Sequence, residues 1–409
     1  MRVSRPVRVL ALVPVLALAC ASERRSFDPE PVTGEFTCGK ENDCDDDGYA
    51  APEDCNDQDK LINPGAYDFP GDNVDNDCDG TIDNPTTACE TIPSENPGSP
   101  TDFARAADIC AQPHYDPLIK AAWGQVKGYG PGQRLWTSET KKEQVGIVTS
   151  FGENTPRRGK TMMGLATGPW NARDPRSGVP LDGTEFHIDD ACKEIPLDAN
   201  DCRALSYGSA GGGVSVQDWA ELRLWLKVPT NAGSGVIDFS FFSTEFNQFW
   251  NASLNDAFFI LVSSQKRSGQ NVATDTNGLG VTVNSGFFQL CPKAPGPPGL
   301  AQDKAAGLQQ CVGVDGDSSL GIFGSIRGTG YDGAAVSSDY TVQAVNGNKY
   351  VYGGGTGWLS AKFPTVPGEE LMVRVIVLDT FDGLKDSAVI VDGFRWEPDD
   401  GTGASRPVR

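Results

Sequence analysis

The sequence predicts a mainly β protein: an antiparallel, jelly-roll-like β-sandwich that follows a small, disulfide-rich N-terminal module. Glycine and proline are abundant, at 48 and 28 residues, and no long amphipathic helical period is present. Three segments instead alternate apolar and polar residues with a period of two, namely Glu221–Val228, Gly235–Phe242 and Leu371–Leu378. Strands with one apolar face are typical of antiparallel sheets that pack face to face.

The first residues are typical of a signal peptide. A basic start precedes the apolar run Val9–Ala19, which is too short to span a bilayer as a stable helix. Leu16–Cys20 resembles a bacterial lipobox, which predicts cleavage before Cys20 and its acylation. Eleven cysteines are an odd number, and lipidation of Cys20 leaves an even set for disulfide bonds in an oxidising compartment. We therefore expect a lipid anchor in the cell outer membrane; ordinary cleavage and secretion is the alternative.

Composition divides the chain into parts that differ in charge and turn content. The predicted parts are a signal peptide (1–19), a lipid-anchored tether (20–37), an acidic cysteine-rich module (38–90), a linker (91–100), a β-sandwich that begins with a helix over Thr101–Cys110 (101–397) and a polar tail (398–409). The net charge of −21 lies largely in the acidic module and argues against a nucleic-acid partner.

Two acidic loops share the pattern D-x-D-x-D-G, and we call them the first loop (Asp43–Asp54) and the second loop (Asp75–Thr86). Ca²⁺ takes six to eight oxygens, and alternate carboxylates followed by a glycine bend supply them in EF-hand loops. Asp54 closes the first loop at position 12, whereas the second loop has Asp83 at position 9 and must close differently. A disordered acidic linker is the alternative. The predicted calcium ligands are Asp43, Asp45, Asp47, Tyr49 and Asp54, and then Asp75, Asp77, Asp79, Thr81 and Asp83.

Residues 41–84 resemble the metal-binding motif of MopE-related proteins. The matching pieces are D-C-N-D-x-D from Asp54, I-N-P-G-A from Ile62 and V-D-N-D-C-D-G-x-I-D from Val74. The family name evokes copper, but copper favours imidazole or thiolate ligands, and both histidines, His114 and His187, lie outside the motif. Calcium is therefore the expected cofactor, which makes this part a calcium-loop module.

Residues 140–397 resemble the choice-of-anchor L domain of bacterial surface and secreted proteins. The resemblance rests on Phe239–Phe246, Leu254–Phe259, Thr356–Trp358 and Asp379–Phe394. It implies a β-sandwich in an extracellular setting and no established activity. We therefore expect a binding or adhesion module for an extracellular glycan or protein ligand, rather than an enzyme.

Several carboxylates adjoin strand-like segments of this large domain, and Asp379, Asp382, Asp386 and Asp392 surround the last two strands. Asp382 precedes a glycine and is typical of a hairpin turn. Carboxylates at the ends of adjacent strands also suit a second calcium site, for which Glu245, Asp256 and Asp386 are the preferred ligands. In the alternative, Glu245 and Asp256 are the acid–base pair of a glycan hydrolase, which needs two carboxylates around one glycosidic bond.

The remaining cysteines are expected to pair locally. Cys192 with Cys202 and Cys291 with Cys311 are each separated by short, turn-rich segments. Pairing among the cysteines between residues 38 and 110 stays open, with Cys55–Cys78 as the first choice. Each bond is expected to stabilise the fold by roughly 2–4 kcal/mol.

Overall fold

The residues described by the computed structural model fall into several segments of the chain. These are 42–85, 89, 98–130, 134–170, 191–195, 197–205, 214–246, 255–264, 267–275, 277–292, 312–320, 322–332, 342–345, 348–351, 353–380, 386–401 and 406–407. The predicted signal peptide and tether, including Cys20, lie outside them. Among the described residues, no helix combines the length and apolar character needed to cross a membrane.

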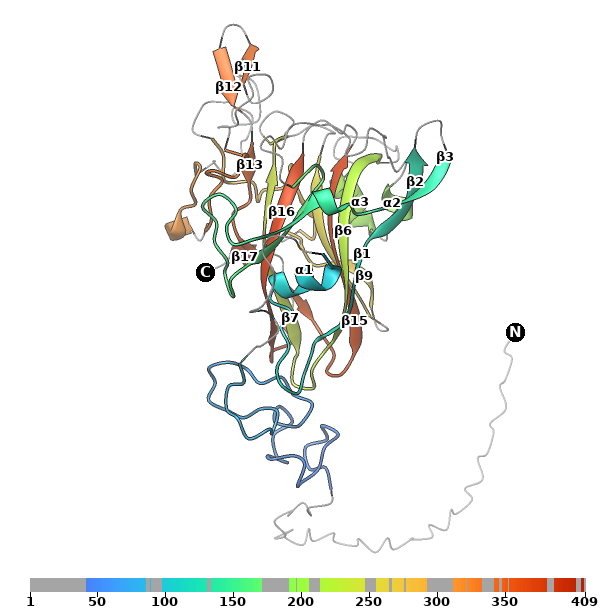
Figure 1. The fold of residues 1–409 in the computed structure, drawn as a ribbon, viewed down its shortest axis with the longest axis vertical. Helices are drawn as coiled ribbons and strands as arrows, with labels where there is room; N and C mark the ends of the chain where they lie inside the picture. Colours follow the sequence, from blue (N-terminus) through green and yellow to red (C-terminus); the bar gives the residue numbers. More distant parts are fainter. Residues whose placement is uncertain are drawn as a thin grey trace, which may run out of the picture. The chain divides into compact units, whose positions relative to one another are not determined.

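Most of the described strands belong to two antiparallel sheets (Figure 1). The six-stranded sheet runs β1 (Leu118–Trp123), β6 (Val216–Lys227), β15 (Glu370–Thr380), β8 (Ala257–Ser264) and β10 (Val281–Thr282), with β9 (Arg267–Asn271) paired to β8. The seven-stranded sheet runs β17 (Arg406–Pro407), β14 (Leu359–Pro364), β7 (Ser234–Ser243), β16 (Ser387–Glu397), β5 (Met162–Ala166) and β4 (Val145–Val148), with β13 (Gly354–Gly355) paired to β7. The predicted mainly β fold is confirmed.

The two sheets share one apolar core. Leu222 and Val375 of the six-stranded sheet and Val391 of the seven-stranded sheet belong to the same buried cluster. Phe239 on β7 meets Phe258 on β8 with ring centroids 4.7 Å apart. Alternate side chains of each strand enter this core, which is how the period of two in the sequence becomes a sandwich.

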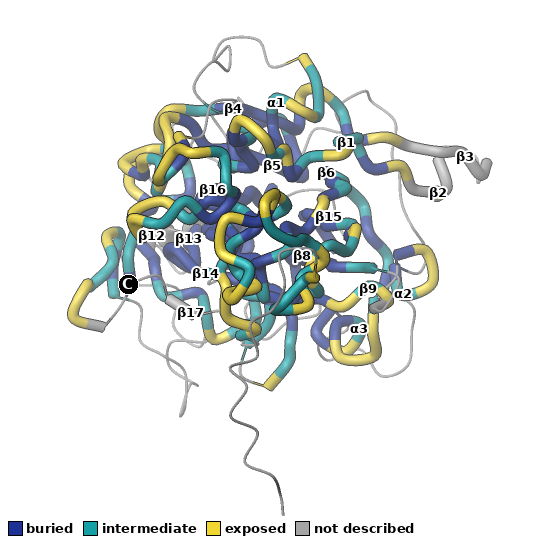
Figure 2. The backbone as a smooth tube through the Cα atoms, turned by 90° about the horizontal axis from the view of Figure 1, so that it is seen from below, coloured by how far each residue is buried: buried dark blue, intermediate teal, exposed yellow. Residues whose placement is uncertain are grey.

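Both sheets are also covered on their outer faces, so the strands are more buried than simple alternation predicts. All ten residues of β7 are buried. Against the six-stranded sheet, Phe259 and Ile376 pack with residues of α2 (Ala191–Glu194) and α3 (Ala199–Leu205). Figure 2 shows the buried residues concentrated in the strands.

The helix expected over Thr101–Cys110 is shorter than its apolar spacing suggests. It is α1 (Pro100–Ala106), which begins at a capping box in which Ser99 and Asp102 satisfy each other's backbone N–H groups. It ends at the C-cap Ala107, and Asp108 then has φ +65, in the left-handed region that stops an α-helix.

The remaining elements are short. They are the hairpin β2 (Gln125–Gly130) with β3 (Arg134–Glu139), the hairpin β11 (Val342–Val345) with β12 (Asn348–Val351), and the single 3₁₀ turns η1 (Lys142–Gln144) and η3 (Ser318–Leu320).

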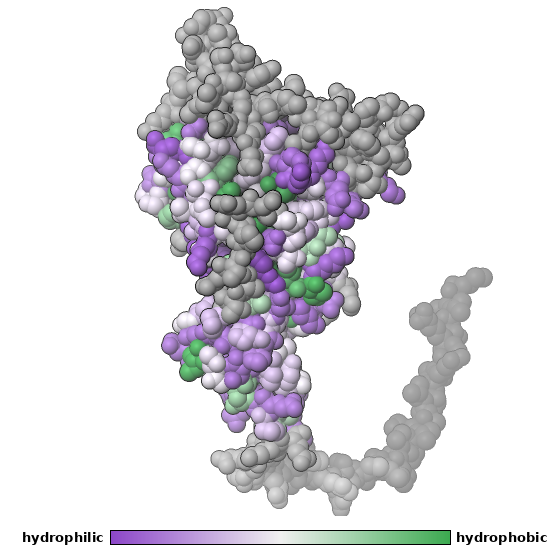
Figure 3. Space-filling model, in the orientation of Figure 1, coloured by the Kyte–Doolittle hydropathy of each residue, from purple (hydrophilic) through white to green (hydrophobic). Residues whose placement is uncertain are grey.

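The acidic module has neither helix nor strand within residues 42–85, and polar side chains fasten it to the sandwich. The turn between β6 and β7 supplies two of these contacts. Thr230 Oγ1 donates to Asn63 Oδ1 at 2.6 Å, and the Tyr67 N–H donates to Asn231 Oδ1 at 2.8 Å. Residues 40–409 accordingly form one compact unit. On the face shown in Figure 3, hydrophilic residues predominate over the module.

Candidate metal-binding sites

The first loop is folded by its own carboxylates. The Asp47 N–H donates to Oδ1 of Asp43 and of Asp45, both at 3.2 Å. The Gly48 N–H donates to Asp43 Oδ2 and the Tyr49 N–H to Asp47 Oδ1, both at 2.8 Å. Gly48 has φ +101, which a residue with a side chain adopts only with strain. Carboxyl oxygens of Asp43, Asp45 and Asp47 consequently lie within 4.8 Å of one another.

Three carboxyl oxygens of this loop are buried and have no hydrogen-bond partner. They are Oδ2 of Asp45, of Asp47 and of Asp54. Asp54, at position 12, is only 3% exposed, and its other oxygen accepts the Asn56 N–H at 2.7 Å. Burial raises the pKa of Asp45 and of Asp54, and the nearby charge of Asp47 raises both further. Burying a carboxylate without a partner is costly, so these oxygens suit a bound cation.

The second loop repeats the same backbone pattern. The Asp79 N–H donates to Oδ1 of Asp75 at 3.1 Å and of Asp77 at 3.4 Å. The Gly80 N–H donates to Asp75 Oδ2 at 2.9 Å, and the Thr81 N–H to Asp79 Oδ1 at 2.7 Å. Carboxyl oxygens of the three aspartates again lie within 4.8 Å of one another. The repeated sequence pattern thus gives a repeated loop geometry.

In the second loop, the Oδ2 atoms of the second and third aspartates already accept hydrogen bonds, whereas the equivalent atoms of the first loop do not. The buried Asn84 side chain donates from Nδ2 to Oδ2 of Asp77 at 3.0 Å and of Asp79 at 2.9 Å. His114 Nε2 lies 3.4 Å from the same oxygen of Asp79. The hydrogen bond from Asn84 is the main cause of a lowered pKa at Asp79, whereas burial raises the pKa of Asp77.

Asp83, a predicted ligand, faces a different part of the module. Its Oδ1 accepts the N–H of Gly71 at 2.7 Å and of Asn73 at 3.3 Å, so it fastens the turn that precedes the loop. Thr86, at position 12, lies outside the described residues. The second loop is instead closed by the fully buried Asp68, whose carboxyl group accepts the N–H groups of Asn76 and Asn84.

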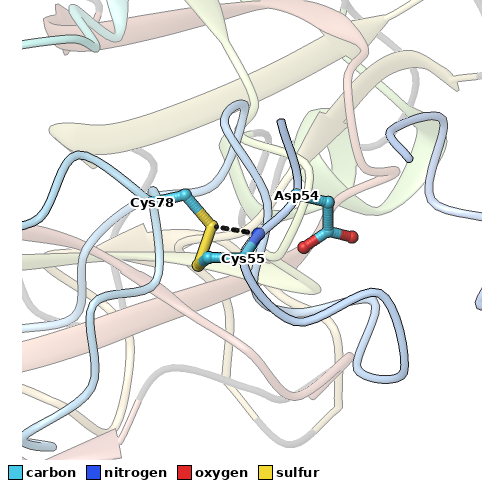
Figure 4. Close-up of side chains that lie close together, drawn as sticks. All are labelled: Asp54, Cys55 and Cys78. Carbon is cyan, nitrogen blue, oxygen red and sulfur yellow. Dashed lines mark hydrogen bonds between the residues drawn. A yellow bond between two sulfur atoms is a disulfide. The ribbon is translucent and has the colours of Figure 1, made fainter. Parts of the chain in front are cut away.

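Disulfide bonds brace the module. Cys55 is joined to Cys78, which links the two loops, and the Cys55 N–H donates to the Cys78 sulfur at 3.1 Å (Figure 4). These sulfurs lie close to Asp54, but sulfur in a disulfide is not a thiolate and does not serve as a metal ligand.

The structure also joins Cys89 to Cys110 and Cys192 to Cys202. Cys44 and Cys291 are disulfide-bonded to cysteines outside the described residues, where the predicted partner Cys311 lies.

A third acidic group lies inside the sandwich. Oxygens of Glu245, Asp256 and Asp379, here called the buried carboxyl cluster, lie within 4.8 Å of one another, and all three residues are 0% exposed. Two of them are preferred ligands of the predicted second calcium site. The third preferred ligand, Asp386, points its carboxylate at Gly168, where a Cβ atom would lie 2.1 Å from Asp386 Oδ2.

Complete burial of Glu245 and Asp256 bears on the hydrolase alternative. A glycoside hydrolase places a sugar between its two carboxylates. Here the Asp256 N–H donates to Glu245 Oε2 at 3.3 Å, and neither side chain is exposed. A glycosidic bond would reach the pair only if the strand ends opened, so the geometry favours metal binding over catalysis.

Sequence reasoning missed Asn84 and His114, and it included Asp379 among the strand-end carboxylates without preferring it as a ligand. Asn84 is uncharged, and His114 lies 35 residues after Asp79, so neither carries a motif signal. Asp379 lies inside β15 and comes near Asp256 only through the pairing of β15 with β8.

Comparison with known proteins gives a family match within the acidic module. Residues 54–84 match a family named for MopE copper binding and described as "Putative metal-binding motif". The match includes residues 75–84 of the second loop but only Asp54, the last residue, of the first. A search among curated proteins finds no significant match. The chain therefore contains a metal-binding motif with a disulfide bond in a mainly β protein.

Proposed function

We propose that the first and second loops bind Ca²⁺, and that the chain is an exported surface lipoprotein whose β-sandwich binds a glycan or protein partner. The observation that carries the calcium assignment is the first loop, where three buried carboxyl oxygens have no hydrogen-bond partner. Asp45 and Asp47 bring oxygens within 4.8 Å of each other and of Asp43, and the charge of Asp54 acts on Asp45, so a cation beside these carboxylates would stabilise them. The second loop would bind Ca²⁺ after the Asn84 amide turns over and presents its oxygen in place of its nitrogen.

Calcium fits the donor set better than copper or zinc. The candidate ligands in the first loop are all oxygens, which hard cations prefer, whereas copper and zinc favour imidazole and thiolate. Cys55 and Cys78 are oxidised, and His114 touches only the outer edge of the second loop with its side chain 63% exposed. Mg²⁺ demands a small octahedral shell and retains several waters, whereas Ca²⁺ accepts six to eight oxygens of the kind that this loop supplies.

The ions would also hold the module against the sandwich. Clustered carboxylates repel one another at neutral pH, and no large apolar core holds residues 42–85 together. Neutralising the first loop would stabilise the segment that leads to Asn63 and Tyr67, whose hydrogen bonds to Thr230 and Asn231 attach the module. Calcium would thereby set the rigidity of the surface that the sandwich presents.

The surface role rests on the sequence. A lipobox-like segment ends at Cys20, and the resemblance to the choice-of-anchor L domain places related sandwiches outside bacterial cells. Replacing Cys20 with Ser should abolish labelling by a fatty-acid analogue and move the protein to the soluble fraction. If wild-type protein takes up no label and the variant stays in the membrane fraction, the lipid anchor is wrong.

Hydrogen–deuterium exchange tests the calcium assignment on the mature chain. Ca²⁺ should slow exchange over residues 42–54 at submillimolar concentration, whereas Cu²⁺ should not. The variant Asp45→Asn/Asp47→Asn should lose this protection, and exchange in β7 serves as the internal reference. Equal exchange with Ca²⁺ and with EDTA would show that the module does not bind calcium.

A glycan array probed with and without Ca²⁺ would test whether the sandwich binds a glycan partner.

A further inference from the structure

The buried carboxyl cluster lies where the two sheets meet. Glu245 follows β7 of the seven-stranded sheet. Asp256 directly precedes β8, and Asp379 is the penultimate residue of β15, both in the six-stranded sheet. Ser387, the first residue of β16, donates its hydroxyl to Asp256 Oδ2 at 2.5 Å and so links the sheets at the same point.

Asp379 has a buried carboxyl group that lacks a stabilising partner. It is 0% exposed, and neither of its oxygens receives a hydrogen bond from a backbone N–H or a hydroxyl group. Its nearest polar neighbours are the carboxyl groups of Asp256 and Glu245. A buried carboxylate surrounded by other carboxylates is strongly unfavourable unless a cation or a proton compensates it.

No described lysine or arginine supplies that compensation for Asp256 or Asp379, because neither takes part in an ion pair with one. The groups around Asp256 are the Ser387 hydroxyl, the Thr380 N–H at 3.3 Å and the two other carboxyls. Burial raises the pKa of Asp256 to about 7 and that of Asp379 well above its usual value. Among the described residues, the buried carboxyl groups of Asp256 and Asp379 therefore have no positively charged partner.

We propose that Glu245, Asp256 and Asp379 together bind one divalent cation of the calcium type, which joins the ends of β7, β8 and β15 across the sandwich. The ligands are all oxygens, and three carboxylates balance a double positive charge with one to spare, as is common for Ca²⁺. The site depends on the sandwich and not on the two loops. Its ligand set differs from the one expected from the sequence, since Asp379 takes the place of Asp386.

Metal content measured in a loop-disabled parent isolates this site. The parent is the full mature chain carrying Asp45→Asn, Asp47→Asn, Asp77→Asn and Asp79→Asn. After dialysis against micromolar Ca²⁺ it should retain one equivalent, which Asp379→Asn and Glu245→Gln should each remove. The control Asp201→Asn changes a buried aspartate of α3 that accepts a hydrogen bond from Asn271 and is not one of the three proposed ligands, so it should leave the equivalent in place. A parent that retains no Ca²⁺ would overturn the proposal.

Thermal unfolding separates an ion from trapped protons. If an ion holds the cluster, EDTA should lower the Tm of the loop-disabled parent by about 5 °C and leave that of Asp379→Asn unchanged. If protons hold it, removing a buried carboxyl should raise the Tm at neutral pH whether or not Ca²⁺ is present. The second pattern would contradict the proposal. Glu245→Gln gives the same comparison if Asp379→Asn does not fold.

Discussion

The two loops of the module have the same backbone hydrogen bonds but differ in whether the Oδ2 atoms of their second and third aspartates accept a hydrogen bond. In both, the third aspartate and the next two residues donate N–H groups to aspartates of the loop with nearly equal distances. In the first loop, Oδ2 of Asp45 and Asp47 has no partner. In the second loop, the equivalent oxygens of Asp77 and Asp79 accept the two N–H groups of the Asn84 amide.

This difference shows that the D-x-D-x-D-G pattern determines the turn but not whether another side chain bonds to its carboxyl oxygens. A residue outside the pattern decides that. Asp54 adds a fourth carboxylate to the first loop, whereas Asn84 places an amide where a cation would lie in the second. We therefore expect the first loop to bind Ca²⁺ more tightly, since more ligand charge and no competing donor both favour the ion.

The largest expected effect is the loss of the first loop. Asp45→Asn/Asp47→Asn removes two of its four carboxylates, each contributing roughly 1.5–3 kcal/mol as a charged contact. The tighter Ca²⁺ affinity should fall by at least about 100-fold. The matched variant Asp77→Asn/Asp79→Asn should remove only the weaker site. Calcium titration calorimetry measures both. Equal losses in the two variants would contradict the inference that the first loop binds Ca²⁺ more tightly than the second.

A reciprocal exchange of the closing residues should bring the loops closer together. Asp54→Asn should weaken the first loop by about tenfold, because one carboxylate becomes a neutral amide. Asn84→Asp should strengthen the second loop by a similar factor, since it removes the donor and adds a charge. Without calcium, Asn84→Asp should lower the Tm, because three carboxyl groups then crowd together. If Asn84→Asp leaves calcium affinity unchanged, the amide does not control the second loop.

The calcium affinity of the two loops should depend differently on pH. A carboxylate must be deprotonated to bind Ca²⁺, so a raised pKa lets protons compete up to a higher pH. The pKa is raised at two carboxylates of the first loop, Asp45 and Asp54. In the second loop burial raises the pKa of Asp77, but the hydrogen bond from Asn84 lowers that of Asp79. The affinity advantage of the first loop should therefore shrink as the pH falls from 7 towards 5. Dissociation constants at pH 7, 6 and 5 would show this; an advantage that grows would contradict it.

His114 offers the smallest expected effect. Its contact with Asp79 is exposed, and exposed ion pairs contribute about 0–1 kcal/mol. His114→Ala should change the calcium affinity of the second loop by less than about fivefold and leave the first loop unchanged. A larger change, or a loss of Cu²⁺ binding with it, would show that the imidazole is a ligand and that the loop prefers a transition metal.

Patterns local in the sequence were predictable and long-range ones were not. The strands around Glu221–Val228 and Leu371–Leu378 follow from alternation, and the turns at Gly48 and Gly80 from spacing. The early end of α1 depends on the left-handed conformation of Asp108, which apolar spacing does not encode. The ligand role proposed for Asp379 depends on the pairing of β15 with β8.

The central claim is that carboxyl oxygens of the first loop are available to a cation, whereas the Asn84 amide occupies the equivalent oxygens of the second. Calcium titration of the wild-type chain at neutral pH, repeated with Asn84→Asp, tests it most directly. We predict a tight and a weaker event in the loops of the wild type, and two events of similar strength in the variant. A wild type in which both loops bind equally tightly, or that shows no binding at millimolar Ca²⁺, would contradict the claim.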